Sequence, residues 1–209
     1  MEYRHQINAR FDDMDPDVKI QLRESLLKEQ GHLCAYCMKR IIDAKDTKIE
    51  HFEARTPENE LQYHNFLAVC RGGDGGPVRA MSCDTKKGNR PIFINPLNKS
   101  DMERIYYSNS GEIHSSDTTS HKFDYQDSTG RSHSGYTSPE QDIQECLNLN
   151  YENGAPLLGR KTALREFQKR RHPYKDRKSK RIYSEQSEYI EPYVGIIRWY
   201  IENFINRET

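Results

Sequence analysis

Four cysteines constrain the fold of this chain more than any other feature of its sequence. Cys34 and Cys37 form a CxxC pair, and Cys70 and Cys83 follow at a wider separation. Two thiolates at CxxC spacing can hold one tetrahedral zinc ion at about 2.3 Å. The interval RGGDGGPVRAMS between Cys70 and Cys83 is rich in glycine, so it can loop out and bring these two thiolates together. The pattern predicts a structural zinc site with four sulfur ligands; unpaired structural cysteines are the alternative.

Other uses of the cysteines are less well supported by their surroundings. A CxxC pair can serve redox chemistry, but no strand–helix–strand pattern surrounds this one. Cys146, in ECLNLNY, lies apart and is expected to be a small core residue. His32 could replace Cys83 as a zinc ligand. Disulfides are not expected, because the cysteine count is odd and the N-terminus has no apolar signal-peptide core, so we expect a cytoplasmic protein.

The composition explains why such a chain would need a metal. Its 209 residues include 32 Lys and Arg against 32 Asp and Glu, and only 34% are hydrophobic. A core that small for the length favours a stabilising metal ion. No apolar run approaches the roughly 18 residues of a membrane-spanning helix. Seven Phe, thirteen Tyr and one Trp argue against wholesale disorder.

The hydrophobic pattern predicts an α+β fold. A helix is expected over 15–31, with Asp15 as N-cap, Pro16 in the first turn and Gly31 just past its end. Further elements are expected along the chain: a strand over 47–52, a turn and short helix over 60–69, a turn or helix over 84–88, a strand over 91–97 and a hairpin over 103–114. The polar segment 115–139 receives no assignment, and helices are expected from 140 onward.

Polar residues between the cysteines suggest phosphodiester hydrolysis. That reaction needs a base to activate water and a hard divalent cation to neutralise charge on the phosphate. His51 suits the base, because an imidazole titrates near neutrality. Glu50 and Asp84 offer the oxygen ligands that Mg²⁺ prefers. Asn65 could orient the imidazole or its loop, and Lys87 could hold a phosphate.

At these residues the chain resembles a known family. CAYC, IEHF, HNF and CDTKKG, in that order, look like an HNH (ββα-metal) nuclease with an embedded zinc site. The run from CAYC to CDTKKGNRPIFINPL looks closer still to the PtuB family, the HNH effectors of Septu-type and retron-associated antiphage systems. The resemblance covers about residues 30–97 and is weaker in NLNYENGAPLLGRKTAL.

The resemblance implies roles for individual residues. His51 would be the general base and Asn65 its orienting partner. Glu50 and Asp84 would hold a catalytic Mg²⁺ or Mn²⁺, and Cys34, Cys37, Cys70 and Cys83 would be the zinc ligands. Two departures are visible: Glu50 is longer than the Asp common at its position, and the Cys70–Cys83 interval is longer than a second CxxC.

The resemblance also implies partners and an organisation of the chain. PtuB-type nucleases work with an ABC/SMC-like ATPase of the PtuA type and, in retron-associated systems, with a reverse transcriptase and its msDNA. The chain has no Walker A motif of its own. We expect four regions: an N-terminal helix over 1–29, a zinc-stapled nuclease core over 30–98, a hairpin and polar loop over 99–139, and a helical region over 140–209.

The C-terminal region carries a basic run. Residues 160–181 hold eleven Lys or Arg against two Asp or Glu, and the run predicts contact with a phosphate backbone, with Arg170 and Arg171 as candidates. Docking on an acidic partner and a merely solvated face are the alternatives. The amphipathic stripe over 184–206, around Trp199, is either core or a protein interface.

The leading hypothesis is therefore a metal-dependent HNH endonuclease that acts within an antiphage complex, on DNA by preference and with RNA left open. The first alternative is a catalytically inactive, zinc-stabilised subunit that binds nucleic acid or serves as an adaptor in the same kind of complex. An unrelated zinc-ribbon adaptor is the second alternative.

Overall fold

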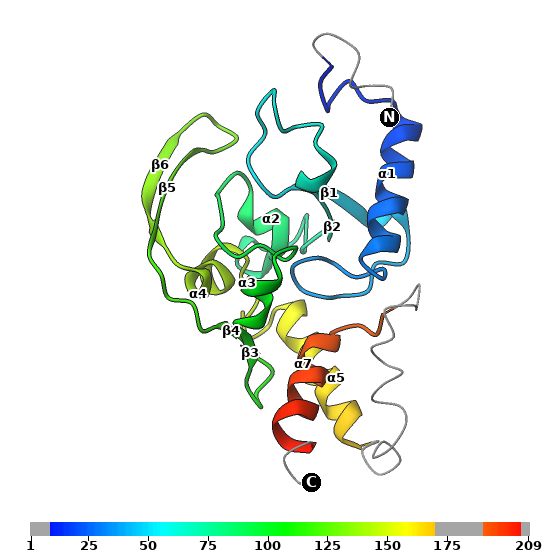
Figure 1. Cartoon of the computed structure of the whole chain (residues 1–209), viewed down its shortest axis with the longest axis vertical. Coiled ribbons are helices and arrows are strands. Elements are labelled where there is room, and N and C mark those ends of the chain that lie inside the picture. The colour runs from blue at the N-terminus through cyan, green and yellow to red at the C-terminus, as the bar shows by residue number, and fades with distance from the viewer. Residues whose placement is uncertain (1–8, 170–189, 206–209) are drawn as a thin grey trace.

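The computed structural model describes residues 9–169 and 190–205, and every structural statement below concerns these parts of the chain. They form a mixed α+β structure with small sheets, each a pair of antiparallel strands (Figure 1). The α+β class expected from the sequence is confirmed. No helix within the described ranges is long and apolar enough to span a membrane.

Helix α1 (Pro16–Glu29) follows the predicted boundaries closely. The Asp15 carboxylate accepts a hydrogen bond from the Asp17 amide at 2.8 Å, and Pro16 occupies the first turn. Gly31 lies just beyond the helix with a φ of +59°, a conformation that glycine adopts without strain. The end of the helix buries Leu26 and Leu27 against the core.

Strands β1 (Thr47–His51) and β2 (Phe66–Cys70) form an antiparallel pair beside α1. Thr47 lies opposite Cys70 and His51 lies opposite Phe66. The strand predicted over 47–52 is confirmed, but the short helix predicted within 60–69 is wrong. Only a single 3₁₀ turn (Tyr63–Asn65) precedes β2, all five residues of which are buried. A five-residue apolar run is too short for a helix, and here β1 supplies its hydrogen-bonding partner.

Helix α2 (Cys83–Lys87) packs against β2 and confirms the turn or helix predicted after Cys83. The strand predicted over 91–97 is wrong: this segment buries Ile92 and Ile94 but pairs with no strand. Two prolines remove amide donors. The Phe93 amide instead donates to the Asp142 carboxylate at 2.6 Å.

Two hairpins follow a short helix, α3 (Lys99–Glu103). Strands β3 (Ile105–Tyr107) and β4 (Ile113–Ser115) form the hairpin predicted over 103–114. Strands β5 (His121–Gln126) and β6 (Ser132–Thr137) form a second hairpin in the segment that received no assignment. The β5–β6 hairpin curves along one side of the molecule in Figure 1.

The C-terminal part is helical, as expected. Helix α4 (Pro139–Gln141) continues into a π-helical turn (Asp142–Cys146). Helix α5 (Ala155–Lys169) packs against α7 (Val194–Tyr200), which continues as a π-helical turn (Ile201–Ile205). The amphipathic segment is therefore partly core, since Ile196 and Tyr200 are buried. Positions 170–189 and 206–209, which carry part of the basic run and of this segment, lie outside the described residues.

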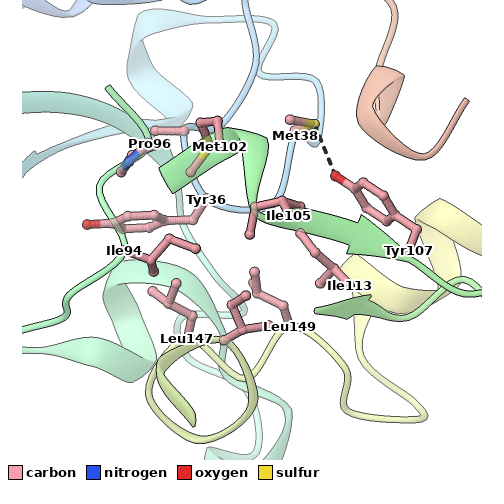
Figure 2. Close-up of a pocket in the computed structure, with 12 residues that line it drawn as sticks. Tyr36, Met38, Ile94, Pro96, Met102, Ile105, Tyr107, Ile113, Leu147 and Leu149 are labelled. Carbon is pink, nitrogen blue, oxygen red and sulfur yellow. Dashed lines mark hydrogen bonds between the residues drawn. The ribbon is translucent and has the colours of Figure 1, made fainter. Parts of the chain in front are cut away.

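An apolar cavity of about 50 Å³ lies where the CxxC turn, the β3–β4 hairpin and the segment after α4 meet (Figure 2). Leucine, isoleucine and methionine side chains surround it. The Tyr107 hydroxyl lies 3.9 Å from the Met38 sulfur at one edge. Tyr36 lies along another edge, and its hydroxyl donates a hydrogen bond to Glu50 Oε1 at 3.0 Å.

Arg160, the first residue of the basic run, is a structural residue in α5. It is only 2% exposed. Its Nε donates to the Gly111 carbonyl at 2.7 Å, and its Nη2 donates to the Leu149 carbonyl at 2.8 Å and to Asn150 Oδ1 at 2.7 Å. One guanidinium thus joins the β3–β4 turn to the segment before α5.

We expect Arg160→Lys to lower the free energy of unfolding by about 1–3 kcal/mol, because an ammonium cannot reach all three acceptors of the planar guanidinium. Arg165→Lys, on the exposed face of the same helix, is the matched control and should change stability by less than about 0.5 kcal/mol. Urea unfolding followed by circular dichroism measures both. Equal effects of the two changes would contradict the structural role of Arg160.

Candidate metal centre and adjoining cleft

The four sulfurs predicted to bind zinc form one compact, buried cluster. The Cys34 and Cys83 sulfurs are 3.9 Å apart, and the Cys37–Cys70 and Cys70–Cys83 distances are both 3.8 Å. All four sulfurs lie within 4.8 Å of one another. A tetrahedron with zinc–sulfur bonds of about 2.3 Å has edges of about 3.8 Å. The cluster could therefore hold a metal ion such as zinc.

Local backbone geometry brings Cys34 and Cys37 to this point. The Met38 amide donates to the Cys34 carbonyl at 2.9 Å, and Met38 takes a φ of +60° that closes the turn. The Cys34 amide donates to the Lys39 carbonyl at 2.9 Å. The Ala35 amide donates to the Ala68 carbonyl at 3.1 Å, so the turn is attached directly to β2.

Gly72 explains how the long interval between Cys70 and Cys83 closes. It has a φ of +55°, and a Cβ at this position would lie 2.0 Å from the Ser82 carbonyl oxygen. The Ser82 amide donates to the Gly72 carbonyl at 2.8 Å, which joins the two ends of the loop. Only glycine permits so close a backbone approach at this φ. The loop therefore delivers Cys83 beside Cys70, and His32 is not part of the cluster.

The four thiols are buried and strongly affect one another's pKa values. Hydrogen bonds from Cys34, Cys37 and Cys83 hold the pKa of Cys70 below its usual range. The Cys34 and Cys70 sulfurs and burial raise the pKa of Cys37, which Cys83 opposes. The Cys34, Cys37 and Cys70 sulfurs and burial raise the pKa of Cys83. Several buried thiolates repel one another unless a cation binds them, and a divalent metal stabilises the fully deprotonated set.

We expect the purified chain to bind one zinc ion, and Cys83→Ser to reduce both the metal affinity and the melting temperature. Cys146→Ser is the matched control: Cys146 is also buried, but lies outside the four-sulfur group. Elemental analysis measures zinc, and cobalt substitution gives a thiolate charge-transfer band whose intensity reports the number of sulfur ligands. Full metal content and an unchanged cobalt spectrum in Cys83→Ser would contradict the four-sulfur site.

A polar cleft of about 550 Å³ adjoins the cluster. Glu50 and His51 enter it from the end of β1, and Asp84 and Lys87 enter it from α2. Asp84 directly follows the cluster residue Cys83, so the position of that sulfur determines where the carboxylate lies. Four of the candidate site residues thus share one cleft. The second wall comes from β5, through Asp124, Tyr125 and Gln126.

Glu50 is buried and its orientation is fixed from one side. The Tyr36 hydroxyl donates to Oε1 at 3.0 Å, and the Lys87 Nζ is 2.6 Å from the same oxygen. Burial raises the pKa of Glu50 to about 8, the Lys87 charge opposes the rise, and Asp84 adds to it. Both of these contacts are to Oε1, and the Asp84 side chain lies close enough to share a hydrogen bond with Glu50. This arrangement fits a hard divalent metal held by few protein ligands.

His51 is held in one tautomer by a backbone oxygen. Its Nε2 lies 3.0 Å from the Glu60 carbonyl. A carbonyl only accepts hydrogen bonds, so Nε2 carries the proton and Nδ1 keeps its lone pair when the ring is neutral. The rings of Phe11 and Phe66 pack edge-on against the imidazole, with centroid distances of 4.7 and 4.9 Å. Burial lowers the pKa of His51, which favours the neutral ring.

Asn65 positions the chain that follows His51 and makes no hydrogen bond to the imidazole. Its Oδ1 accepts the Glu53 amide at 2.7 Å, and its Nδ2 donates to the Glu53 carbonyl at 3.1 Å. The Phe52 amide donates to the Asn65 carbonyl at 2.9 Å. The sequence suggested that Asn65 could orient either the imidazole or the loop that follows it. These contacts fit the role on the loop.

The structure does not test the three residues predicted to bind phosphate. The Lys87 side chain is 4% exposed and its ammonium lies on Glu50, so a contact with phosphate stays a prediction. Arg170 and Arg171 lie outside the described residues.

Sequence reasoning missed several groups that form this site. The Glu60 carbonyl orients His51, but a backbone oxygen leaves no signal in residue type. The Glu60 carboxylate is 2% exposed, accepts the Phe11 amide at 3.0 Å and pairs with Arg10, so it anchors the N-terminal segment over the His51 ring. Tyr36 lies between the two cysteines of the CxxC pair. Its hydroxyl could have been recognised from the sequence as a polar group next to the predicted zinc site.

No protein-family model matches this chain, and no curated protein matches it.

Proposed function

We propose that this protein is a metal-dependent endonuclease of the HNH type that hydrolyses phosphodiester bonds, with DNA favoured as the substrate. The observation that carries the proposal is the state of His51. Its proton is directed to the Glu60 carbonyl, and the ring shares a cleft with the carboxylates Glu50 and Asp84. A neutral imidazole could act as the base that the reaction needs, and the two carboxyl groups could hold the divalent cation.

The order of the elements supports the same proposal. Strand β1 ends at His51, β2 returns antiparallel to it, and α2 follows with Asp84 in its first turn. The resemblance to ββα-metal nucleases implies this order, with a zinc site beside it. We therefore propose an HNH core over residues 30–98 that a bound zinc ion stabilises.

The chain's own residues have distinct tasks in the proposed reaction. Mg²⁺ or Mn²⁺, held by Glu50 and Asp84, would neutralise charge on the phosphate when bound. His51 accepts a proton at Nδ1 from the water that attacks phosphorus. Tyr36 and Lys87 hold Glu50 in place, and Asn65 holds the loop that follows the base. Displacement of the 3′ oxygen leaves products with a 5′-phosphate.

The resemblance further supports a place in an antiphage complex with a PtuA-type ATPase and, where the system is retron-associated, with a reverse transcriptase and its msDNA. Because the sequence has no Walker A motif, any control by nucleotide would come from such a partner. Co-expression with the neighbouring ATPase gene, followed by co-purification, tests this part separately from the chemistry.

One observation favours a second candidate, the inactive nucleic-acid-binding or adaptor subunit. The Lys87 ammonium forms a buried ion pair with Glu50 Oε1 at 2.6 Å. A carboxylate balanced in this way could be a structural group alone. This candidate predicts binding to nucleic acid and no cleavage when Mg²⁺ or Mn²⁺ is added.

We expect His51→Ala to slow cleavage of plasmid DNA by about 10²- to 10⁴-fold in Mg²⁺ or Mn²⁺, because it removes the general base. His64→Ala is the matched control, since His64 is exposed and should leave the rate unchanged. EDTA should abolish cleavage, and total RNA assayed in parallel determines the substrate class. Cleavage by His51→Ala at the wild-type rate would overturn the assignment.

At saturating divalent ion, the cleavage rate should fall as the pH drops through the His51 pKa, because only the neutral ring accepts a proton. Burial lowers this pKa below the ordinary value of 6.5; nearby Arg55 adds to the effect, and Glu60 and Asp12 oppose it. A bound cation would lower it further. We therefore expect the acid-side midpoint of the rate profile below pH 6.5. A midpoint above that value, or an unchanged profile in His51→Ala, would contradict the role of His51.

A further inference from the structure

A basic groove of about 450 Å³ lies next to the cleft, and none of its basic residues takes part in the chemistry described above. Lys19 and Arg23 reach it from α1, Lys45 from the turn before β1, Lys48 from β1 and Arg71 from the residue after β2. Asp84 is the single acidic residue that lines it. The whole chain has a net charge of zero, so this concentration of positive charge is local.

Two of these cations have little to bind within the described parts of the chain. The Lys45 side chain is exposed, and no ion pair is found for it there. The Arg23 Nε is buried and has no hydrogen-bond partner among the described residues. A buried donor without an acceptor is unfavourable, and an anionic oxygen would satisfy it.

Lys48 and Arg71 have only long contacts to carboxylates. The Lys48 Nζ lies 3.7 Å from Asp74 and 3.6 Å from Asp84, longer than a direct hydrogen bond in each case. The Arg71 Nε lies 3.7 Å from the Asp46 carboxylate, and both side chains are mostly exposed. An exposed pair such as Arg71–Asp46 contributes little energy, so an incoming phosphate can replace the acidic partner.

The groove lies directly beside the cleft. Ile49 and Asp84 line both hollows, and Asp84 therefore stands where the groove meets the cleft. A chain of phosphates that enters along Lys45 and Arg71 would reach Asp84 directly. The same strand, β1, thus carries Lys48 toward the groove and Glu50 toward the cleft.

We propose that this groove binds the phosphate backbone of the nucleic acid on one side of the bond to be cut. The inference rests on the proposed function for its choice of ligand, but it concerns residues outside the catalytic set. Contacts of this kind act through counterion release and do not read sequence.

Binding is measured with the full chain in EDTA, by fluorescence anisotropy of labelled duplex and single-stranded oligonucleotides over a range of salt concentrations. The test variant is the triple change Arg23→Gln, Lys45→Gln, Arg71→Gln. The matched control removes three exposed lysines elsewhere: Lys28→Gln, Lys39→Gln, Lys99→Gln. Zinc content and melting temperature check that each variant folds, and the single variant Lys45→Glu replaces the triple should it unfold.

We expect the groove triple to weaken duplex binding about tenfold or more, and to reduce the slope of log K against log salt by about 2 to 3. The control triple should leave both quantities close to wild type. Wild-type affinity and slope in the groove triple, or equal losses in the control triple, would overturn the proposal, as would a wild-type chain that binds no nucleic acid.

The outcomes also separate this inference from the nuclease proposal. Groove-dependent binding without any His51-dependent cleavage would support the groove and overturn the nuclease. His51-dependent cleavage with unchanged binding by the groove triple would support the nuclease and overturn the groove. An acidic protein partner as the true occupant would appear as unchanged affinity for nucleic acid in the groove triple.

Discussion

The contact among four sulfurs determines where every other group of the site lies. Cys34 and Cys37 follow α1, Cys70 ends β2 and Cys83 begins α2, so one cluster joins three segments. The strand register carries this constraint further, because Thr47 pairs with Cys70 and the ladder runs from there to His51. Asp84 is the next residue after Cys83. The cluster thus positions the base through one strand and the carboxylate through one peptide bond.

This arrangement places several polar groups where burial disfavours their charge. Glu50, His51 and Lys87 are each less than a tenth exposed. Burial of an unpaired charge is costly, and here each group has a specific partner: Tyr36 and Lys87 for Glu50, and the Glu60 carbonyl for His51. Side chains held in this way need little reorganisation when a substrate arrives. The core and the buried polar site therefore depend on the same cysteine-bearing segments.

The sequence predicted those parts of the structure that depend on neighbours along the chain. The capping of α1 by Asp15, the turn at Cys34–Cys37 and the hairpin over 103–114 follow from local residue types. The parts it did not predict depend on distant partners: 91–97 is no strand because Asp142 binds its backbone, and the β5–β6 hairpin forms a wall only because the chain folds back on the cleft. The grouping of the four cysteines was predictable from the CxxC pair and the glycine-rich interval, whereas the orientation of His51 was not.

Basic residues show the same difference between local composition and spatial arrangement. The densest basic segment begins with Arg160, which is buried and bonds to backbone carbonyls, so its charge is not available to a ligand. The basic groove is built instead from single lysines and arginines separated by long stretches of sequence, among them Lys19, Lys45 and Arg71. The β1–β2 pair brings them together, and that pair is attached to the cysteine cluster. A metal bound by the cysteines would hold the β1–β2 pair in place. It would therefore support both the proposed chemistry in the cleft and the proposed binding surface beside it.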